Sequence, residues 1–152
     1  MADASDVQRR TTAIALGVSI GLLFWGVIAR VWFAGPRGNI GLAGIERCTP
    51  FCELTLWLDA NAPTEITVLG FTALLFGLKS VVLATHAFAM VVKRERMRIR
   101  RRWLLVCTSI TAAACAGFLI RMLGEPVSLS YPGFFAIIGG LGVFVLAYRI
   151  KP

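Results

Sequence analysis

The sequence predicts an all-α membrane protein, a bundle of four transmembrane helices with a small antiparallel β element in the first extracytoplasmic loop. Two observations support this fold class. Of the 152 residues, 57% are hydrophobic, which is too apolar for a soluble domain of this size. Four apolar segments each approach the roughly 20 residues that a helix needs to cross ~30 Å of hydrocarbon. They cover residues 12–33, 66–92, 103–123 and 134–150 and predict a single integral membrane domain in a lipid bilayer.

A basic run at residues 93–102 separates the second and third segments and holds seven of the sixteen Lys and Arg residues. Such a run accumulates on the cytosolic side of a membrane. We therefore expect cytosolic termini, residues 34–65 on the other side, and a location in the plasma membrane or bacterial inner membrane. The +8 charge is a topology signal, and no nucleic-acid partner is predicted. The topology residues are Lys93, Arg94, Arg96, Arg98, Arg100, Arg101 and Arg102.

The first segment is too long for the core of a signal peptide, and no clear cleavage site follows it, so we interpret it as a retained helix. It contains Gly17 and Gly21, a spacing that lets another helix approach closely, within the bundle or in a homodimer. Aromatic residues at the ends of the segments are expected to anchor the chain at the membrane interfaces. These residues are Trp32, Trp103, Tyr131 and Tyr148.

The loop over residues 34–65 contains an alternating stretch at residues 52–59, and a period of two predicts a half-buried strand. Residues 39–47 can supply its antiparallel partner. A two-stranded hairpin is marginal alone, so we expect it to be supported by the membrane surface, the other loop or a disulfide. One face carries Leu54, Leu56 and Leu58, and the other carries Glu53, Thr55, Trp57 and Asp59.

Cys48 and Cys52 flank the connection between these two stretches. On the oxidising side of the membrane, two cysteines at this spacing across a tight turn are expected to form a disulfide. No zinc site is expected, because the loop has no third or fourth Cys or His. At the outer ends of the first and third helices, Arg30 and Arg121 are expected to pair with Glu65 or Glu125.

Polar residues spaced by sevens form one stripe along the second helix: Thr72, Lys79 and His86, continuing to Lys93. Lys79 falls at the middle of the span, where an unpaired charge is costly, and none of the four apolar segments contains Asp or Glu. We expect Lys79 to be neutral, bonded to hydroxyls or carbonyls near Thr72 and Ser80, or paired with a carboxylate of another molecule. The third option makes Thr72, Lys79 and His86 candidate contacts for a partner, together with Trp57 in the extracytoplasmic loop. The alternative is that Lys79 serves only internal packing.

No catalytic, cofactor or metal site is predicted. His86 is the sole histidine, whereas a haem or a zinc ion needs additional ligands. Cys107 and Cys115 in the third helix are expected to be small core residues. No nucleophile with a base, carboxylate pair or phosphate-binding glycine loop is present, so a non-enzymatic protein is expected.

The order of these segments resembles the claudin and peripheral myelin protein superfamily of four-helix membrane proteins. That family has a tryptophan near the end of its first helix, which Trp32 matches. It also has a Gly-Leu-Trp motif followed by two cysteines; here Gly41 and Leu42 precede Ala43, and a cysteine pair follows. The resemblance implies a sheet standing on a left-handed four-helix bundle and a role in contacts within or between membranes.

Three functions are compatible with these patterns. We favour a non-enzymatic assembly module that makes lateral or extracytoplasmic contacts with other membrane subunits or with itself, as an accessory subunit or a claudin-like structural protein. A membrane thiol oxidoreductase coupled to quinone would need a second reactive cysteine pair. An oligomeric channel or transporter subunit would line its pathway with the stripe of the second helix.

Overall fold

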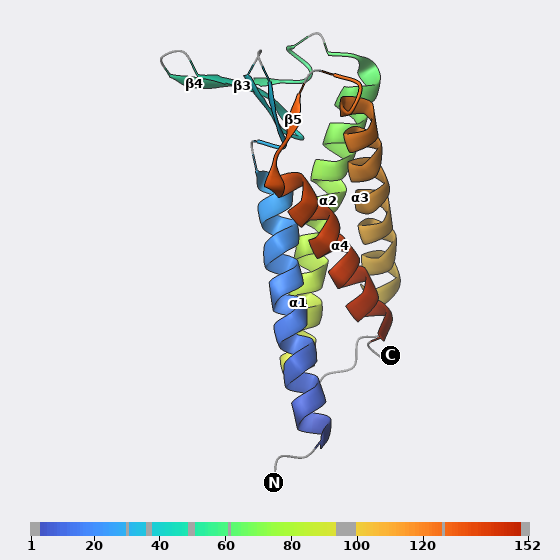
Figure 1. Ribbon diagram of the computed structural model, residues 1–152. Helices are drawn as coiled ribbons and strands as arrows, with labels where there is room; N and C mark the ends of the chain where they lie inside the picture. Colours follow the sequence, from blue (N-terminus) through green and yellow to red (C-terminus); the bar gives the residue numbers. More distant parts are fainter. Residues whose placement is uncertain are drawn as a thin grey trace.

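The computed structural model describes residues 4–29, 31–35, 38–48, 51–60, 62–93, 100–125 and 127–149. In these residues, four long helices form a bundle with a small sheet at one end (Figure 1). Each helix contains a stretch long and apolar enough to cross a membrane, which confirms the predicted four-helix fold. The helices are α1 (Ala4–Ile28), α2 (Thr64–Lys93), α3 (Arg100–Met122) and α4 (Tyr131–Arg149).

The two ends of the bundle differ in chemistry. We call the end that carries the sheet the sheet end, and the end where α2 stops and α3 starts the basic end (Figure 1). Helix α1 also begins at the basic end, and α4 ends there. Of the predicted topology residues, Lys93, Arg101 and Arg102 lie at this end, whereas Arg94, Arg96, Arg98 and the side chain of Arg100 fall outside the described part.

Helix α1 begins and ends earlier than hydropathy predicts. Polar residues ahead of the apolar segment continue the helix, and there Asp6 pairs with Arg9 one turn later at 3.4 Å. The helix ends at Ile28, and the chain then enters the sheet. The backbone N–H of Trp32 donates a hydrogen bond to the Ile40 carbonyl at 2.6 Å, so these residues follow the sheet rather than the helix.

The described residues form one antiparallel sheet of five short strands, in the order β4-β3-β2-β1-β5. The predicted hairpin is present as β3–β4, with Gly44 opposite Leu56 and Cys48 opposite Cys52. The predicted partner stretch 39–47 is divided between β2 and β3, and the predicted strand over 52–59 ends at Leu56. The sequence does not predict β1 and β5, which have only three and two residues and no alternating pattern. The strands are β1 (Phe33–Gly35), β2 (Gly38–Ile40), β3 (Gly44–Cys48), β4 (Cys52–Leu56) and β5 (Ser128–Leu129).

An aromatic cluster seats the sheet on the bundle. Phe118 of α3 is fully buried, and its ring centroid lies 5.8, 6.2 and 6.3 Å from those of Trp32, Phe33 and Trp57. The indole N–H of Trp32 donates to the Gly26 carbonyl at 2.7 Å. Trp32 is therefore a core residue, and the prediction that it anchors at a membrane interface is wrong. Its ring and its N–H both find partners inside, which favours burial.

The other predicted anchors are exposed near the ends of helices, as membrane-interface residues should be. Trp103 is at the basic end of α3, Tyr148 at the basic end of α4, and Tyr131 at the sheet end of α4. Trp25, close to the sheet end of α1, is also exposed. It takes the place that the sequence assigns to Trp32.

Small residues bring α1 and α4 close together. A Cβ added to Gly139 would overlap the backbone of Leu23, and one added to Gly26 would overlap the backbone of α4. The predicted pair of Gly17 and Gly21 does not form this contact, since nothing lies within 4 Å of a Cβ placed on Gly21. Close packing by small residues is therefore present, but on another face of α1 than the sequence indicates.

Candidate functional site

Strand β4 forms one edge of the sheet and stands away from the bundle (Figure 1). It pairs with β3, and in the described part of the chain no strand lies on its other side. The backbone groups on that side are therefore open to another chain. Four apolar side chains on this strand and just beyond its two ends are exposed: Phe51 by 81%, Leu58 by 69%, Leu54 by 42% and Leu56 by 38%. We call these four residues and the open side of the strand the β4 edge.

The structure shows which of the two predicted faces of the stretch 52–59 is turned inward. The alternation correctly places the leucines and Trp57 on different faces, but Trp57 is the buried residue, with 3% of its surface exposed. Its indole N–H donates to the Leu42 carbonyl at 2.9 Å. The tryptophan occupies the core because its large ring and its N–H are both satisfied there. Trp57 thus presents no ring to a partner, which corrects its predicted role as a contact residue.

A disulfide between Cys48 and Cys52 closes the tip of the β3–β4 hairpin, as predicted. Both residues are exposed. The bond joins two residues that lie directly opposite each other, so it fixes the pairing register of the two strands. A slip by one residue would move every side chain to the other face. Together with β5, which comes from the second loop, the disulfide supplies the support that an isolated hairpin lacks.

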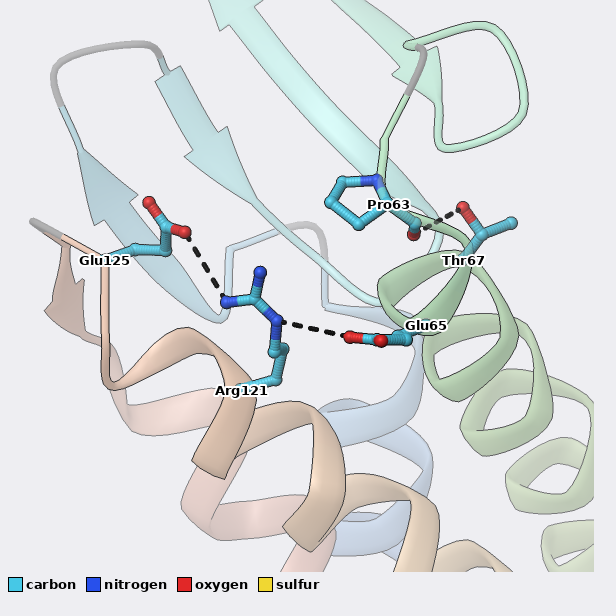
Figure 2. A network of polar contacts seen from close by, with 5 residues as sticks. All are labelled: Pro63, Glu65, Thr67, Arg121 and Glu125. Atoms are coloured by element: carbon cyan, nitrogen blue, oxygen red, sulfur yellow. Dashed lines mark hydrogen bonds and ion pairs between the residues drawn. The ribbon is translucent and has the colours of Figure 1, made fainter.

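Arg121 connects three elements at the sheet end (Figure 2). Its Nε lies 3.6 Å from Glu65 at the start of α2, and its Nη1 lies 3.5 Å from Glu125 in the loop leading to β5. The predicted pairing of Arg121 is thus confirmed, whereas Arg30 lies outside the described residues. All three side chains are partly exposed, and each such pair contributes at most about 1 kcal/mol. The network orients the second loop beside the sheet.

The predicted polar stripe lies on the outside of α2. Thr72 and His86 are half-buried and Lys79 is exposed. The Lys79 ammonium lies 5.6 Å from the centre of the Trp103 ring on α3. Ser80 is buried, and its hydroxyl donates to a backbone carbonyl of its own helix at 2.7 Å. In the described residues Lys79 contacts the Trp103 ring instead of the hydroxyls of Thr72 or Ser80, one of its three predicted surroundings, while contact of the stripe with a partner stays a prediction.

Arg101 joins the start of α3 to the end of α4. Its Nε donates to the Ala147 carbonyl at 3.1 Å and its Nη2 to the Tyr148 carbonyl at 2.6 Å. The guanidinium also lies 5.8 Å from the centre of the Tyr148 ring. Carbonyls in the last turn of a helix lack partners within the helix, and a cation complements the helix dipole there. This topology residue therefore also has a structural role.

In the part of the chain that the structure describes, no group of three or more His, Cys, Asp or Glu side chains could hold a metal ion. Cys107 and Cys115 are fully buried in α3, as predicted for core residues. Eight positions along a helix separate them by about 12 Å. These two thiols therefore do not form the second reactive pair that exchange with the Cys48–Cys52 disulfide would require.

Comparison with protein-family models, with curated proteins and with solved structures finds no match. The class of protein is defined by the fold alone: four helices long and apolar enough to cross a membrane, with a sheet at one end, indicate an integral membrane protein. Within this class, function depends on the surfaces that the fold presents rather than on the fold. The β4 edge and the outer face of α2 are the two surfaces with unusual chemistry.

Proposed function

We propose that this protein is a non-enzymatic membrane assembly module that uses the β4 edge to bind other membrane proteins. The exposure of Phe51, Leu54, Leu56 and Leu58 on and beside a strand whose outer side is open carries this proposal. Scattered exposed apolar residues are ordinary on a protein surface. A row of them on an open strand edge is different, because it promotes pairing with other chains unless a partner covers it.

The β4 edge is also held rigidly, which lowers the entropy lost on binding. The disulfide fixes one end of the strand, and Trp57 anchors the other end in the core. Pairing with β3 runs over the whole strand, from Cys52 to Leu56. A partner would therefore meet a preformed surface.

The orientation that we propose follows the positive-inside rule, with the basic end in the cytosol and the sheet outside it. The disulfide agrees with this arrangement, because such bonds persist in oxidising compartments. In a plasma membrane or bacterial inner membrane, the β4 edge would meet subunits of the same membrane or of a facing one. The resemblance to the claudin superfamily supports either an accessory subunit or a claudin-like structural protein.

Site-specific photo-crosslinking in native membranes tests the proposal. A photoreactive residue at Leu58 should give a discrete protein adduct, whereas one at Leu141, which is 59% exposed on α4, should not. An adduct of twice the 16.5 kDa chain would identify self-association, and any other mass a different subunit. No protein adduct at Leu58, or the same adducts at both positions, would contradict the proposal.

Charge placed on the β4 edge gives a second test. Lysine at Leu54 and Leu56 should abolish the Leu58 adduct, because charged edge strands resist pairing. Glu53→Lys on the same strand is the matched control, since its side chain lies on the other face from the two leucines. Adduct formation that survives the double substitution would show that the β4 edge is not the contact surface.

A further inference from the structure

Lys79 lies near the middle of α2, about 21 Å from the end of that helix at a rise of 1.5 Å per residue. Leu75 and Val82, its neighbours on the same face, are 63% and 69% exposed. This face is therefore directed away from the bundle and toward lipid. A charge at this depth is costly unless polar groups surround it.

The Lys79 side chain turns toward the basic end. Its ammonium lies 5.6 Å from the centre of the Trp103 ring, and Trp103 is close to the start of α3 at that end. A lysine that extends along its helix toward an interface keeps its charge near water and headgroups. Lys79 therefore extends toward that interface although its backbone lies near the middle of the span.

No carboxylate neutralises this charge in the described chain. Residues 66–93 and 100–122 contain no Asp or Glu. The Trp103 ring attracts the cation but does not neutralise its charge. The ammonium is therefore able to bind an anion from outside the chain.

Trp103 adds a second hydrogen-bond donor without an acceptor. Trp32 and Trp57 each donate their indole N–H to a backbone carbonyl. Trp103 is 59% exposed, and within the described residues its N–H has no acceptor. The Lys79 ammonium and the indole ring that carries this N–H therefore lie in contact on the exposed side of α2 and α3, 5.6 Å apart at the ring centre. We call this pair the Lys79–Trp103 site.

We propose that the Lys79–Trp103 site binds the headgroup of an anionic phospholipid. The phosphate would accept hydrogen bonds from the Lys79 ammonium and the Trp103 indole, while the acyl chains extend along α2 toward the sheet end. Charge-assisted hydrogen bonds to phosphate are among the strongest in proteins. This lipid site is independent of the β4 edge and goes beyond the assembly function.

Two observations favour a lipid over a carboxylate on a partner helix. The ammonium is directed away from the middle of the membrane and toward the basic end. The described residues at that end include the exposed Lys93 and Arg102, and clustered basic residues concentrate anionic lipids around them. The basic residues at this end and the two donors of the Lys79–Trp103 site thus both favour a negatively charged lipid headgroup.

Native mass spectrometry of the purified protein tests this site, with phosphatidylglycerol and phosphatidylcholine of identical acyl chains as probes. Wild type should retain phosphatidylglycerol, and Lys79→Met should weaken that binding at least about tenfold. Lys93→Met, which removes one charge from the basic end, should retain the lipid. Millimolar inorganic phosphate should not displace it, because the acyl chains contribute to binding.

Substitution of Trp103 by phenylalanine separates the two donors. This change keeps an aromatic ring beside Lys79 but removes the N–H. We therefore expect the affinity for phosphatidylglycerol to fall about three- to tenfold. Crosslinking from Leu58 should be unchanged in both variants, which also shows that they fold. Equal retention of phosphatidylglycerol by wild type and Lys79→Met, or equal retention of both lipids by wild type, would overturn the proposal. Loss of a bound membrane protein instead of lipid would identify a partner carboxylate.

Discussion

Replacing Phe118 by alanine removes the ring on which the three aromatic residues of the sheet end rest. Phe118 is fully buried, and its ring lies between 5.8 and 6.3 Å from those of Trp32, Phe33 and Trp57. Truncation of a buried phenylalanine to alanine costs about 3–5 kcal/mol. For a chain of this length, each kcal/mol lowers the melting temperature by about 2–4 °C. We therefore expect a decrease of about 6–20 °C.

Thermal unfolding in mild detergent, followed by tryptophan fluorescence, measures this change, because two of the four tryptophans contact Phe118. Phe134→Ala is the matched control: Phe134 is 48% exposed on α4, so detergent or lipid can replace its contacts. The control should lose less than about 1 kcal/mol. If the two variants melt within about 2 °C of each other, the aromatic cluster does not seat the sheet.

Three further predictions concern packing, helix capping and topology. Gly139→Leu should abolish folding, because its side chain would overlap the α1 backbone, whereas Gly21→Leu, with open space around it, should purify normally in detergent. Arg101→Gln removes two hydrogen bonds to carbonyls in the last turn of α4, so hydrogen-exchange protection there should fall about tenfold. Equal protection in Arg101→Gln and in the control Arg102→Gln would refute the capping role of Arg101. A reporter fused near Thr55 should be accessible only from outside the cytosol, and cytosolic access would reverse the proposed orientation.

Local patterns were sufficient to predict the helices and the hairpin. A transmembrane helix satisfies its backbone internally, so its length and hydropathy are properties of one segment. The strands β3 and β4 are adjacent in the chain, and the cysteines mark the turn between them. Strands β1, β2 and β5 are too short to show a period, and β5 pairs with β1 only because the bundle brings the two loops together.

The candidate site shows a different limit of sequence patterns. Alternation shows which side chains of β4 share a face, but not which face is buried. That choice depended on the Leu42 carbonyl and the Phe118 ring, which come from other parts of the chain. Similarly, the spacing of the α2 stripe identified Lys79 as unusual, whereas the ring beneath it belongs to another helix and could not be predicted from that spacing.

The origin of β5 has a consequence for biogenesis. Strand β1 is synthesised directly after α1, but its outer neighbour β5 arrives only after α3 has crossed the membrane. Until then the sheet is one strand short, and the side of β1 that β5 later covers is open to pairing with another chain. The sheet is completed only when the third helix has been inserted in the direction that brings β5 next to β1.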